Sequence, residues 1–487
     1  MDNDRPPEFP QPTGRTLLID GAWRAGAESF ARQDPADLAT VTGTFARARA
    51  EDVADAYAAA GRAAPGWAGT TFDRRATVLH EAARIIERNL DTAAERLTAD
   101  MGKAIGDARL EVQRAATIFR YFAGELSQPT GETYDSADPS TLLLTLEDPV
   151  GVTCAITPWN FPFAIPAWKL APAIGFGNTV VWKPAEAASG SAVFLARALQ
   201  EAGLPDGVLN LITGYGRELS SALTSDPALA AITFTGSGGV GNVIRRSVAD
   251  RNVKIQLELG GKNPAVVLAD ADLDLAADQI ARGAMLSTGQ RCTATSRAYV
   301  DGEVWDEFVE LLRGRVEAMT VGDPRDPATD LGPAASLAQK ETVDDYLALA
   351  REEGATFVCG VDQADHECFV SPTVLTGVSP GSRLVREEIF GPVVVLLPAD
   401  GLEDALAQAN DTEFGLSSTV FTRDLASALE FVRRSESGVV HVNRETAGVE
   451  PHVPFGGLKG SSTQAREQGK AARRFFTSIR TAYVRSG

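Results

Sequence analysis

The chain has 487 residues, of which 44% are hydrophobic, and a formal net charge of −19. This length predicts two or more substructures that share a large buried interior. The acidic balance excludes nucleic acid and anionic membrane surfaces as expected partners, because binding to either relies on clustered Lys and Arg. The polar start from Met1 to Gly14 has no basic stretch followed by an apolar core, so we expect no secretory signal.

Four cysteines lie far apart without a Cys-x-x-Cys pair, and four histidines show no ligand spacing. We therefore expect reduced thiols, a cytoplasmic location and no metal. The uncharged stretch from Pro149 to Trp168 is long enough for a membrane span, but its prolines would break a helix repeatedly. A buried strand running into an irregular loop is predicted there instead.

In the N-terminal part, Thr16 to Trp23 predicts a short strand pair, and Asp52 to Trp67 and Phe72 to Met101 predict long helices. Helical patterns continue to residue 126. Strand patterns then appear at Thr141 to Leu146 and, at the end of the chain, at Phe475 to Val484. We expect these two segments to pair at a sheet edge, where subunits commonly join.

From Val152 the pattern alternates between short apolar strands and amphipathic helices. The predicted strands are 152–156, 179–182, 208–212 and 231–234, and the helices between them are 166–174, 191–202 and 218–223. This alternation is typical of an α/β fold with a doubly wound parallel sheet, which binds ligands at the carboxyl ends of its strands. Further strands are expected at 254–259 and 264–268, and a second alternation runs from Asp272 to about Val442.

One cysteine, Cys292, follows the helix predicted over Asp272 to Leu286 and a glycine turn. This position predicts a presented thiol, which becomes a good nucleophile as the thiolate. The guanidinium of Arg291 would assist if it points toward the sulfur. The alternative is a small buried hydrophobic residue, as an isolated cysteine usually is.

Two stretches suggest a nucleotide site. Phe234 to Gly241 contains the spacing G-x-G-x-x-G after a strand and before a helix, where backbone N–H groups bind a pyrophosphate. A tight turn without a ligand is the alternative. Lys183 and Glu186 follow the strand 179–182 and are either a ribose-binding pair or a solvated ion pair.

Two polar residues lie among apolar neighbours. Asn160 stands in the rigid loop Pro158 to Pro162, where its amide would either stabilise an oxyanion or satisfy its own turn. Glu258 precedes a glycine pair and is either a paired core acid or a general base with a raised pKa.

These stretches, in this order, resemble the aldehyde dehydrogenase superfamily. The matching segments are 158–162, 183–186, 234–241, 257–262, 289–292, 387–392 and 454–457. The resemblance implies an NAD(P)-binding domain of Rossmann type (1–126 and 149–258, with 459–470), a second α/β catalytic domain (259–458), and a small β flap for oligomerisation (127–148 and 471–487). A homodimer or homotetramer is expected.

The resemblance also implies the catalytic residues. Cys292 would be the nucleophile and Glu258 the base for hydrolysis, and Asn160 with the backbone N–H of Cys292 would form the oxyanion hole. Lys169 would lie close to a proton-relay path. Transfer of the acyl group to coenzyme A is the alternative outcome, but it would not need Glu258 as a base.

For the cofactor, the resemblance implies an adenine ribose site, a pyrophosphate site and a nicotinamide site. The residues would be Lys183, Glu186 and Gly216 at the adenine side, Ser237 and Trp159 at the pyrophosphate, and Glu388 and Phe390 at the nicotinamide. The carboxylate of Glu186 favours NAD, because it repels a 2′-phosphate. NADP stays possible if Lys183 accepts that phosphate.

The substrate expectation is an aldehyde with an acidic far end. The segments 293–297, 446–449 and 466–470 resemble the subgroup that oxidises 2-oxoglutarate semialdehyde. The expected pocket residues are Phe161, Trp168, Arg291, Thr293 and Phe455, and the candidate cations for a carboxylate are Arg120, Arg291 and Arg444. If the aromatic residues decide specificity, aliphatic or aromatic aldehydes are expected instead.

Two alternatives come from outside the dehydrogenases. One is a catalytically silent structural or binding protein, because a fold can outlive its chemistry. The other is a thiol hydrolase that pairs Cys292 with His452, and it leaves the nucleotide motifs unexplained.

Overall fold

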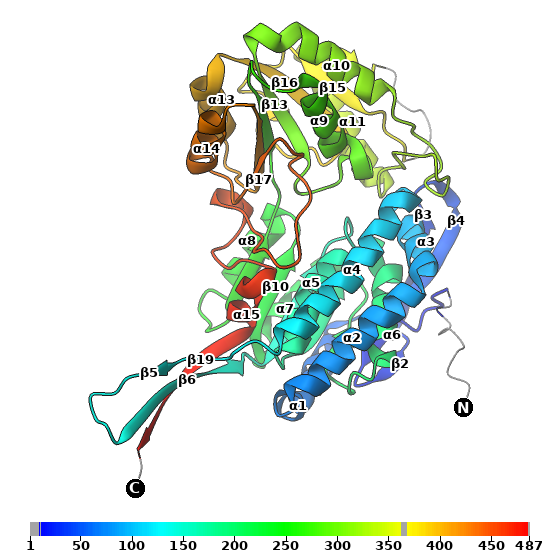
Figure 1. Ribbon diagram of the computed structural model, residues 1–487. Coiled ribbons are helices and arrows are strands. Elements are labelled where there is room, and N and C mark those ends of the chain that lie inside the picture. The colour runs from blue at the N-terminus through cyan, green and yellow to red at the C-terminus, as the bar shows by residue number, and fades with distance from the viewer. Residues whose placement is uncertain (1–8, 10, 362–367, 486–487) are drawn as a thin grey trace.

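A computed structural model describes residues 9, 11–361 and 368–485 of the chain. Most of the polar start, in which no secretory signal is expected, lies outside the described residues. The chain forms two α/β lobes, and a thin β arm projects from the lower lobe with the C-terminus at its tip (Figure 1). No helix among the described residues is long and apolar enough to cross a membrane.

The lower lobe is built on a seven-stranded sheet with the order β11-β10-β7-β8-β9-β1-β2. Its strands are β1 (Leu17–Ile19), β2 (Ala22–Arg24), β7 (Val152–Thr157), β8 (Thr179–Pro184), β9 (Leu209–Leu211), β10 (Leu229–Thr235) and β11 (Lys254–Glu258). The strands from β7 to β11 pair in parallel, and the β1–β2 hairpin adds antiparallel to β9. The predicted doubly wound sheet and the predicted N-terminal strand pair are therefore confirmed.

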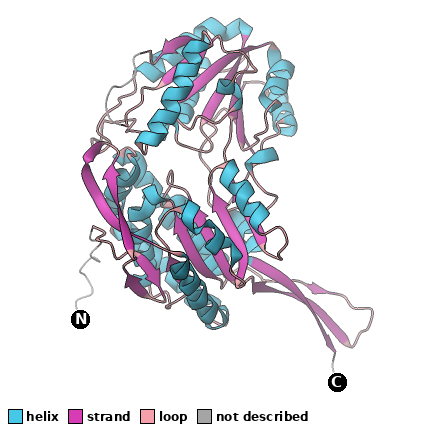
Figure 2. Ribbon diagram, turned by 180° about the vertical axis from the view of Figure 1, so that it is seen from behind, coloured by secondary structure: helices cyan, strands magenta, loops and turns pink. Residues whose placement is uncertain are grey.

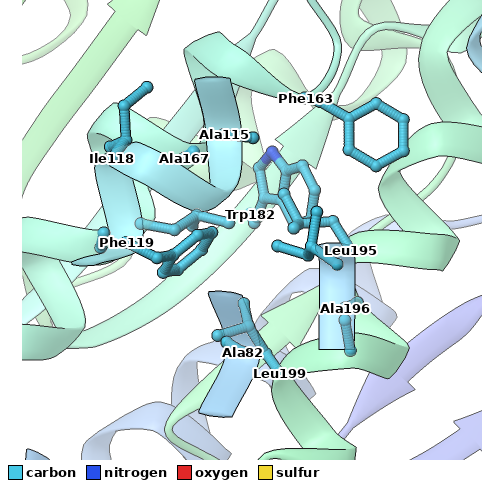
Figure 3. Packing of buried hydrophobic residues seen from close by; sticks show 14 of the residues in the cluster. Ala82, Ala115, Ile118, Phe119, Phe163, Ala167, Trp182, Leu195, Ala196 and Leu199 are labelled. Atoms are coloured by element: carbon cyan, nitrogen blue, oxygen red, sulfur yellow. The ribbon is translucent and has the colours of Figure 1, made fainter. Parts of the chain in front are cut away.

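Helices cover both faces of this sheet. Successive residues of β8 point to opposite faces, so its side chains pack alternately into the two helical layers. Trp182 is fully buried among alanine, leucine and phenylalanine side chains of one helical layer, and its Nε1 donates to Thr157 Oγ1 at 2.9 Å (Figure 3). Val181 packs into the opposite core. The helices on the side of Trp182 are α2 (Phe72–Arg88), α3 (Leu90–Met101), α4 (Ile105–Glu125), α5 (Ala164–Gly175) and α6 (Ser189–Glu201); those opposite are α1 (Ala50–Ala68), α7 (Gly216–Ser225) and α8 (Gly238–Ser247).

The upper lobe has a second seven-stranded sheet with the order β14-β15-β16-β13-β12-β17-β18. Its strands are β12 (Asn263–Val267), β13 (Thr295–Asp301), β14 (Thr356–Cys359), β15 (Thr373–Thr376), β16 (Val393–Ala399), β17 (Ser417–Phe421) and β18 (Val439–Val442). Its helices are α9 (Leu273–Met285), α10 (Trp305–Glu317), α11 (Leu337–Glu352), α12 (Arg383–Arg386), α13 (Gly401–Asn410) and α14 (Leu425–Arg434). The strands and helices of this lobe correspond to the second alternation that the sequence predicts.

The projecting arm is a three-stranded sheet in which β19 (Thr477–Arg485) pairs antiparallel with β6 (Thr141–Pro149), and β6 with β5 (Thr133–Tyr134). Both views show it extending away from the lobes (Figures 1 and 2). The predicted pairing of the two segments is confirmed. The predicted start of the second strand was wrong, because Phe475 and Phe476 end α15 (Gly469–Phe476), where both aromatic side chains are buried.

Two further expectations about the N-terminal part need correction. The single helix predicted over Phe72 to Met101 is two helices, because the backbone leaves the helical region at Asn89, whose side-chain amide donates to the carbonyl of Ile85 at 2.8 Å. A hairpin of β3 (Glu28–Asp34) and β4 (Asp37–Arg47) was not predicted.

Candidate active site

A cavity of about 750 Å³ lies at the carboxyl ends of the parallel strands β7, β8 and β10. Trp159 follows β7, Lys183 and Glu186 lie at and after the end of β8, and Ser237 follows β10. This is the edge of a doubly wound sheet at which nucleotides bind.

At one end of this cavity, Glu186 Oε1 accepts from Lys183 Nζ at 3.0 Å and from the backbone N–H of Gly216 at 2.7 Å. Burial opposes the ionisation of Glu186, but Lys183 and the backbone N–H donors outweigh it, so the pKa of Glu186 is lowered. Burial lowers the pKa of Lys183, and Glu186 counteracts this. The ammonium of Lys183 makes no other hydrogen bond among the described residues, so it has donors to offer to a ribose hydroxyl.

The middle of the cavity faces the N-terminus of α8. Ser237 caps this helix, with its Oγ accepting from the N–H of Val240 at 3.5 Å. A Cβ added at Gly238 or Gly239 would meet no atom within 4 Å, so the first turn of the helix is open on this side. Exposed N–H groups and the helix dipole at such a terminus suit a pyrophosphate.

The ring of Phe390 packs edge-on against Trp159, which lines this cavity, with a centroid distance of 5.4 Å. Phe390 has a left-handed φ of 59°, a conformation that non-glycine residues adopt mainly where surrounding structure imposes it. Glu388 Oε1 accepts from Gly261 N–H at 3.0 Å, and burial raises the pKa of Glu388 to about 7. The residues present therefore fit both ends of a dinucleotide.

A second cavity, of about 420 Å³, is lined by Cys292. The thiol stands just beyond α9, as predicted, because Ser287 and Thr288 take left-handed φ angles of 54° and 56° and end the helical path. The loop is then fixed to β12, since Asn263 Nδ2 donates to the carbonyls of Cys292 at 2.8 Å and Ala294 at 2.9 Å.

Asn160 lies beside the cysteine loop. Its Nδ2 donates to the carbonyl of Gln290 at 3.1 Å, and the residue is only 3% exposed. Its own carbonyl accepts from Lys103 Nζ at 2.9 Å, and Lys103 forms a buried ion pair with Glu111. Asn160 is thus held from two directions next to the segment that carries the thiol.

Burial, together with the nearby carboxylates of Glu388, Glu258 and Glu467, raises the pKa of the Cys292 thiol to about 12. Arg291 was expected to assist ionisation of the Cys292 thiol, and the structure does not support this. Its guanidinium lies between Asp107 at 3.5 Å and Glu445 at 3.6 Å, so its charge is already paired.

Glu258 ends β11 in a buried, acidic surrounding. Its Oε2 accepts from Ser462 Oγ at 2.6 Å, whereas Oε1 is buried without a hydrogen-bond partner among the described residues. Burial, with repulsion from Glu467, raises the pKa of Glu258 well above its usual range. Glu467 is itself ion-paired with the buried Lys169, whose Nζ also donates to Thr233 Oγ1 at 2.9 Å.

All five expected pocket residues line the cavity of Cys292: Phe161, Trp168, Arg291, Thr293 and Phe455. The rings of Trp168 and Phe455 lie 5.8 Å apart between centroids. The expected alternative cations Arg120 and Arg444 do not line this cavity, and Arg120 pairs with Glu87 at the surface.

The pairing of Cys292 with His452 is not supported either, because His452 is exposed and does not line the cavity. Within the described ranges, no group of three or more His, Cys, Asp or Glu side chains could hold a metal ion.

Several polar residues that surround the site were not predicted from the sequence. These are Lys103, Asp107, Glu111, Arg114, Glu445 and Ser462. They come from four separate stretches of the chain, and only the stripe on α4 carries a local signal: Asp107, Glu111 and Arg114 recur at helical spacing and so share one face.

The two lobes and the two cavities define a dinucleotide-dependent oxidoreductase with a thiol at its substrate pocket. The chain belongs to the aldehyde dehydrogenase family, whose model matches residues 23–482. It is 40% identical over 475 residues to an alpha-ketoglutaric semialdehyde dehydrogenase of Bacillus subtilis (96% of this chain, 97% of the relative) and 42% identical over 475 residues to an alpha-ketoglutarate semialdehyde dehydrogenase of Haloferax volcanii (96% and 98%). The structure superposes with a TM-score of 0.94 on betaine aldehyde dehydrogenase from Staphylococcus aureus in complex with NAD+, at 31% identity, covering 97% of this chain and 95% of the other.

Proposed function

We propose that this aldehyde dehydrogenase oxidises a short aldehyde with a carboxylate at its far end, with 2-oxoglutarate semialdehyde as the best candidate. The observation that carries this proposal is the lining of the cavity at Cys292. Four cationic side chains stand there among aromatic ones: Lys103, Arg114, Arg282 and Arg291. An anion out of water requires a cation or several hydrogen bonds, and the two relatives named above oxidise this semialdehyde by name.

In the first half of the proposed reaction, Cys292 loses its proton to solvent water, and the resulting thiolate adds to the aldehyde carbon. The carbonyl oxygen becomes an oxyanion that Asn160 Nδ2 and the backbone N–H of Cys292 stabilise. A bound NAD(P)+ supplies the acceptor for the hydride that leaves this carbon. Loss of the hydride converts the adduct on Cys292 into a thioester.

In the second half, Glu258 acts as general base. Its Oε1, which has no other partner among the described residues, accepts a proton from a water molecule that attacks the thioester carbon. The carbon–sulfur bond breaks, the carboxylic acid leaves, and Cys292 is regenerated. Lys169 supports this step through its ion pair with Glu467, whose carboxylate adjoins Glu258.

The rival substrate class is aliphatic or aromatic aldehydes, favoured by the packing of Trp168 against Phe455. We expect kcat/KM at fixed NAD+ to be highest for 2-oxoglutarate semialdehyde, then succinic semialdehyde, then hexanal and benzaldehyde. If hexanal or benzaldehyde exceeds both semialdehydes tenfold, about 1.4 kcal/mol of transition-state discrimination, the acidic substrate is wrong.

For the cofactor we propose NAD rather than NADP, held at its adenine ribose by Lys183, Glu186 and Gly216. Because the lowered pKa of Glu186 keeps it ionised at neutral pH, it repels a 2′-phosphate. Replacing Glu186 by Gln should raise kcat/KM for NADP+ relative to NAD+ by about tenfold. Glu201→Gln, at a surface pair with Arg88, is the matched control. An unchanged ratio would contradict the role of Glu186.

The other parts of the dinucleotide are assigned to residues in and beside the first cavity. We place the pyrophosphate at Ser237 and Trp159, the nicotinamide ribose at Glu388, and the nicotinamide ring near Phe390. Ser237 and Trp159 line the cavity, Phe390 packs against Trp159, and Glu388 accepts from the N–H of Gly261.

We further propose the domain roles. The NAD(P)-binding domain comprises 1–126, 149–258 and 459–470, since the sheet of the lower lobe ends with β11 and residues 461–463 run beside it. The catalytic domain comprises 259–458, which contain the whole second sheet. The segments 127–148 and 471–487 serve oligomerisation.

The oligomer is proposed as a homodimer or homotetramer joined through the arm. β19 is an edge strand that exposes Ile479 and Tyr483 by 74% and 75%, a surface expected to be covered. Light scattering should give two or four times the 51.5 kDa chain mass, and Ile479→Asp should lower it. A wild-type mass of one chain would contradict this.

A cytoplasmic location is proposed from the thiols, because no disulfide joins any cysteines in the described part of the chain. A disulfide in protein isolated from cells under non-reducing conditions would contradict it.

A further inference from the structure

The cavity of Cys292 contains four cationic side chains, and three of them are already accounted for. Lys103 is buried in its ion pair with Glu111. Arg291 is shared between two carboxylates, as described above, and Arg282 is exposed to solvent. Arg114 is the fourth.

Unlike Lys103 and Arg291, Arg114 forms no ion pair among the described residues, and unlike Arg282 it is not exposed. Its Nη2 is buried, and neither a hydrogen bond nor an ion pair to it occurs within the described residues. Burial lowers its pKa, and the more distant carboxylates of Glu450 and Glu111 counteract this. A buried guanidinium nitrogen without an acceptor is costly in a folded protein, so its presence at a cavity wall calls for an acceptor that arrives with a ligand.

The nearest acid on the same helix cannot serve as that acceptor. Glu111 Oε1 accepts from the backbone N–H groups of Phe163 at 2.9 Å and Ala164 at 3.2 Å, and Oε2 is bound to Lys103. Both oxygens of Glu111 are therefore committed. Glu450 is exposed and forms no ion pair with Arg114.

The position of Arg114 on α4 suits the far end of a substrate. It follows Leu110 by one turn on the helix face that lines the cavity, and Phe161 and Trp168 supply apolar walls in the same cavity. A short chain attached at Cys292 would thus have apolar contacts along its methylene groups and a guanidinium for a terminal carboxylate. A guanidinium binds a carboxylate through two parallel hydrogen bonds, which a lysine cannot reproduce.

We propose that Arg114 binds the carboxylate of the aldehyde substrate and sets the preference for acidic aldehydes. This inference rests on the proposed function, because it presupposes a substrate with an anionic far end. It assigns the carboxylate anchor to α4 rather than to Arg291 or Arg444.

The test compares wild type, Arg114→Met, Arg114→Lys and Arg120→Met with 2-oxoglutarate semialdehyde and with hexanal at saturating NAD+. Arg120 lies on the same helix but outside the cavity and is the matched control. Arg114→Met should lower kcat/KM for the semialdehyde about 10- to 100-fold, mainly through KM, and leave hexanal within about threefold. Arg114→Lys should recover part of the loss, and Arg120→Met should behave as wild type.

Inhibition by glutarate, an unreactive dicarboxylate, gives a second readout, and its Ki should rise in Arg114→Met by a similar factor. Equal losses for both aldehydes, or no loss with the semialdehyde, would overturn the role of Arg114, even if the wild type prefers the semialdehyde. A wild type that prefers hexanal overturns the proposed substrate class itself, and with it this inference. The preference of the wild type between the two aldehydes thus tests the proposed function. The change of that preference in Arg114→Met tests the role of Arg114.

Discussion

Replacing Cys292 by alanine is expected to lower kcat for aldehyde oxidation by about 10⁴-fold or more, the order lost when a covalent nucleophile is removed. The variant has no atom that can hold the substrate carbon while the hydride leaves. Because Cys292 lines the second cavity and not the dinucleotide-sized one, binding of NAD+ should be unchanged.

Activity is measured as NADH formation and NAD+ affinity by calorimetry on the same preparation. Cys359→Ala is the matched control, since this thiol is buried in the upper-lobe core, away from both cavities. Retained oxidation in Cys292→Ala would refute its role as nucleophile, and lost NAD+ binding would refute the separation of the two cavities.

The state of the thiol adds a pH dependence to this prediction. A pKa of about 12 leaves Cys292 almost wholly protonated at neutral pH in the dinucleotide-free protein. Because only the thiolate reacts, alkylation by iodoacetamide should be slow at pH 7 and rise about tenfold per pH unit up to pH 9. A rate that is already maximal at pH 7 would contradict the raised pKa.

Much of the fold could be predicted because hydrophobic periodicity is a local property. The strands β7, β8 and β10 and the helices between them appeared at nearly their observed places, and so did the pairing of β6 with β19. The failures came from tertiary context. Asn89 interrupts a continuous helical pattern through one side-chain hydrogen bond, and Phe475 and Phe476 have strand-like composition but pack as the last turn of α15.

In the site, the residues within sequence motifs could be predicted, but their partners could not. Motifs located the pocket-lining residues Cys292, Trp159 and Ser237, because each occurs in a short segment with a recognisable order. The partners of those residues could not be found in this way. The acid next to Glu258 lies 209 positions later, at Glu467 (467 minus 258), and nothing local in the sequence marks that contact.

The direction in which a side chain points could not be predicted from the sequence either. Arg291 adjoins Cys292 in sequence, yet its guanidinium turns to Asp107 on α4 and to Glu445. Neighbours on an irregular loop share no face, so sequence adjacency carried no information on this contact. Helical spacing on α4 did carry such information for Arg114, which lies on the same helix face as Asp107 and Glu111.

Replacing Glu258 by glutamine is expected to slow steady-state turnover by about 10²- to 10⁴-fold, the usual contribution of a general base. Formation of the thioester on Cys292 does not use this base in the proposed scheme. A rapid burst of about one NADH per active site should therefore precede the slow phase. The raised pKa of Glu258 also predicts a rising limb in the pH profile of kcat, because the carboxylate appears only as pH passes that pKa. The variant should lack this limb.

Stopped-flow absorbance measures the burst, and hydroxylamine, which attacks thioesters without needing a base, should accelerate the slow phase of the variant. Glu201→Gln, a surface change, is the control and should show wild-type turnover. Loss of the burst itself would mean that Glu258 serves the addition of the thiol. Since Glu258 contributes to the high pKa of Cys292, its neutralisation should make the thiol easier to ionise. Alkylation of Cys292 in Glu258→Gln should therefore be at least as fast as in wild type, which separates a lost base from a damaged nucleophile.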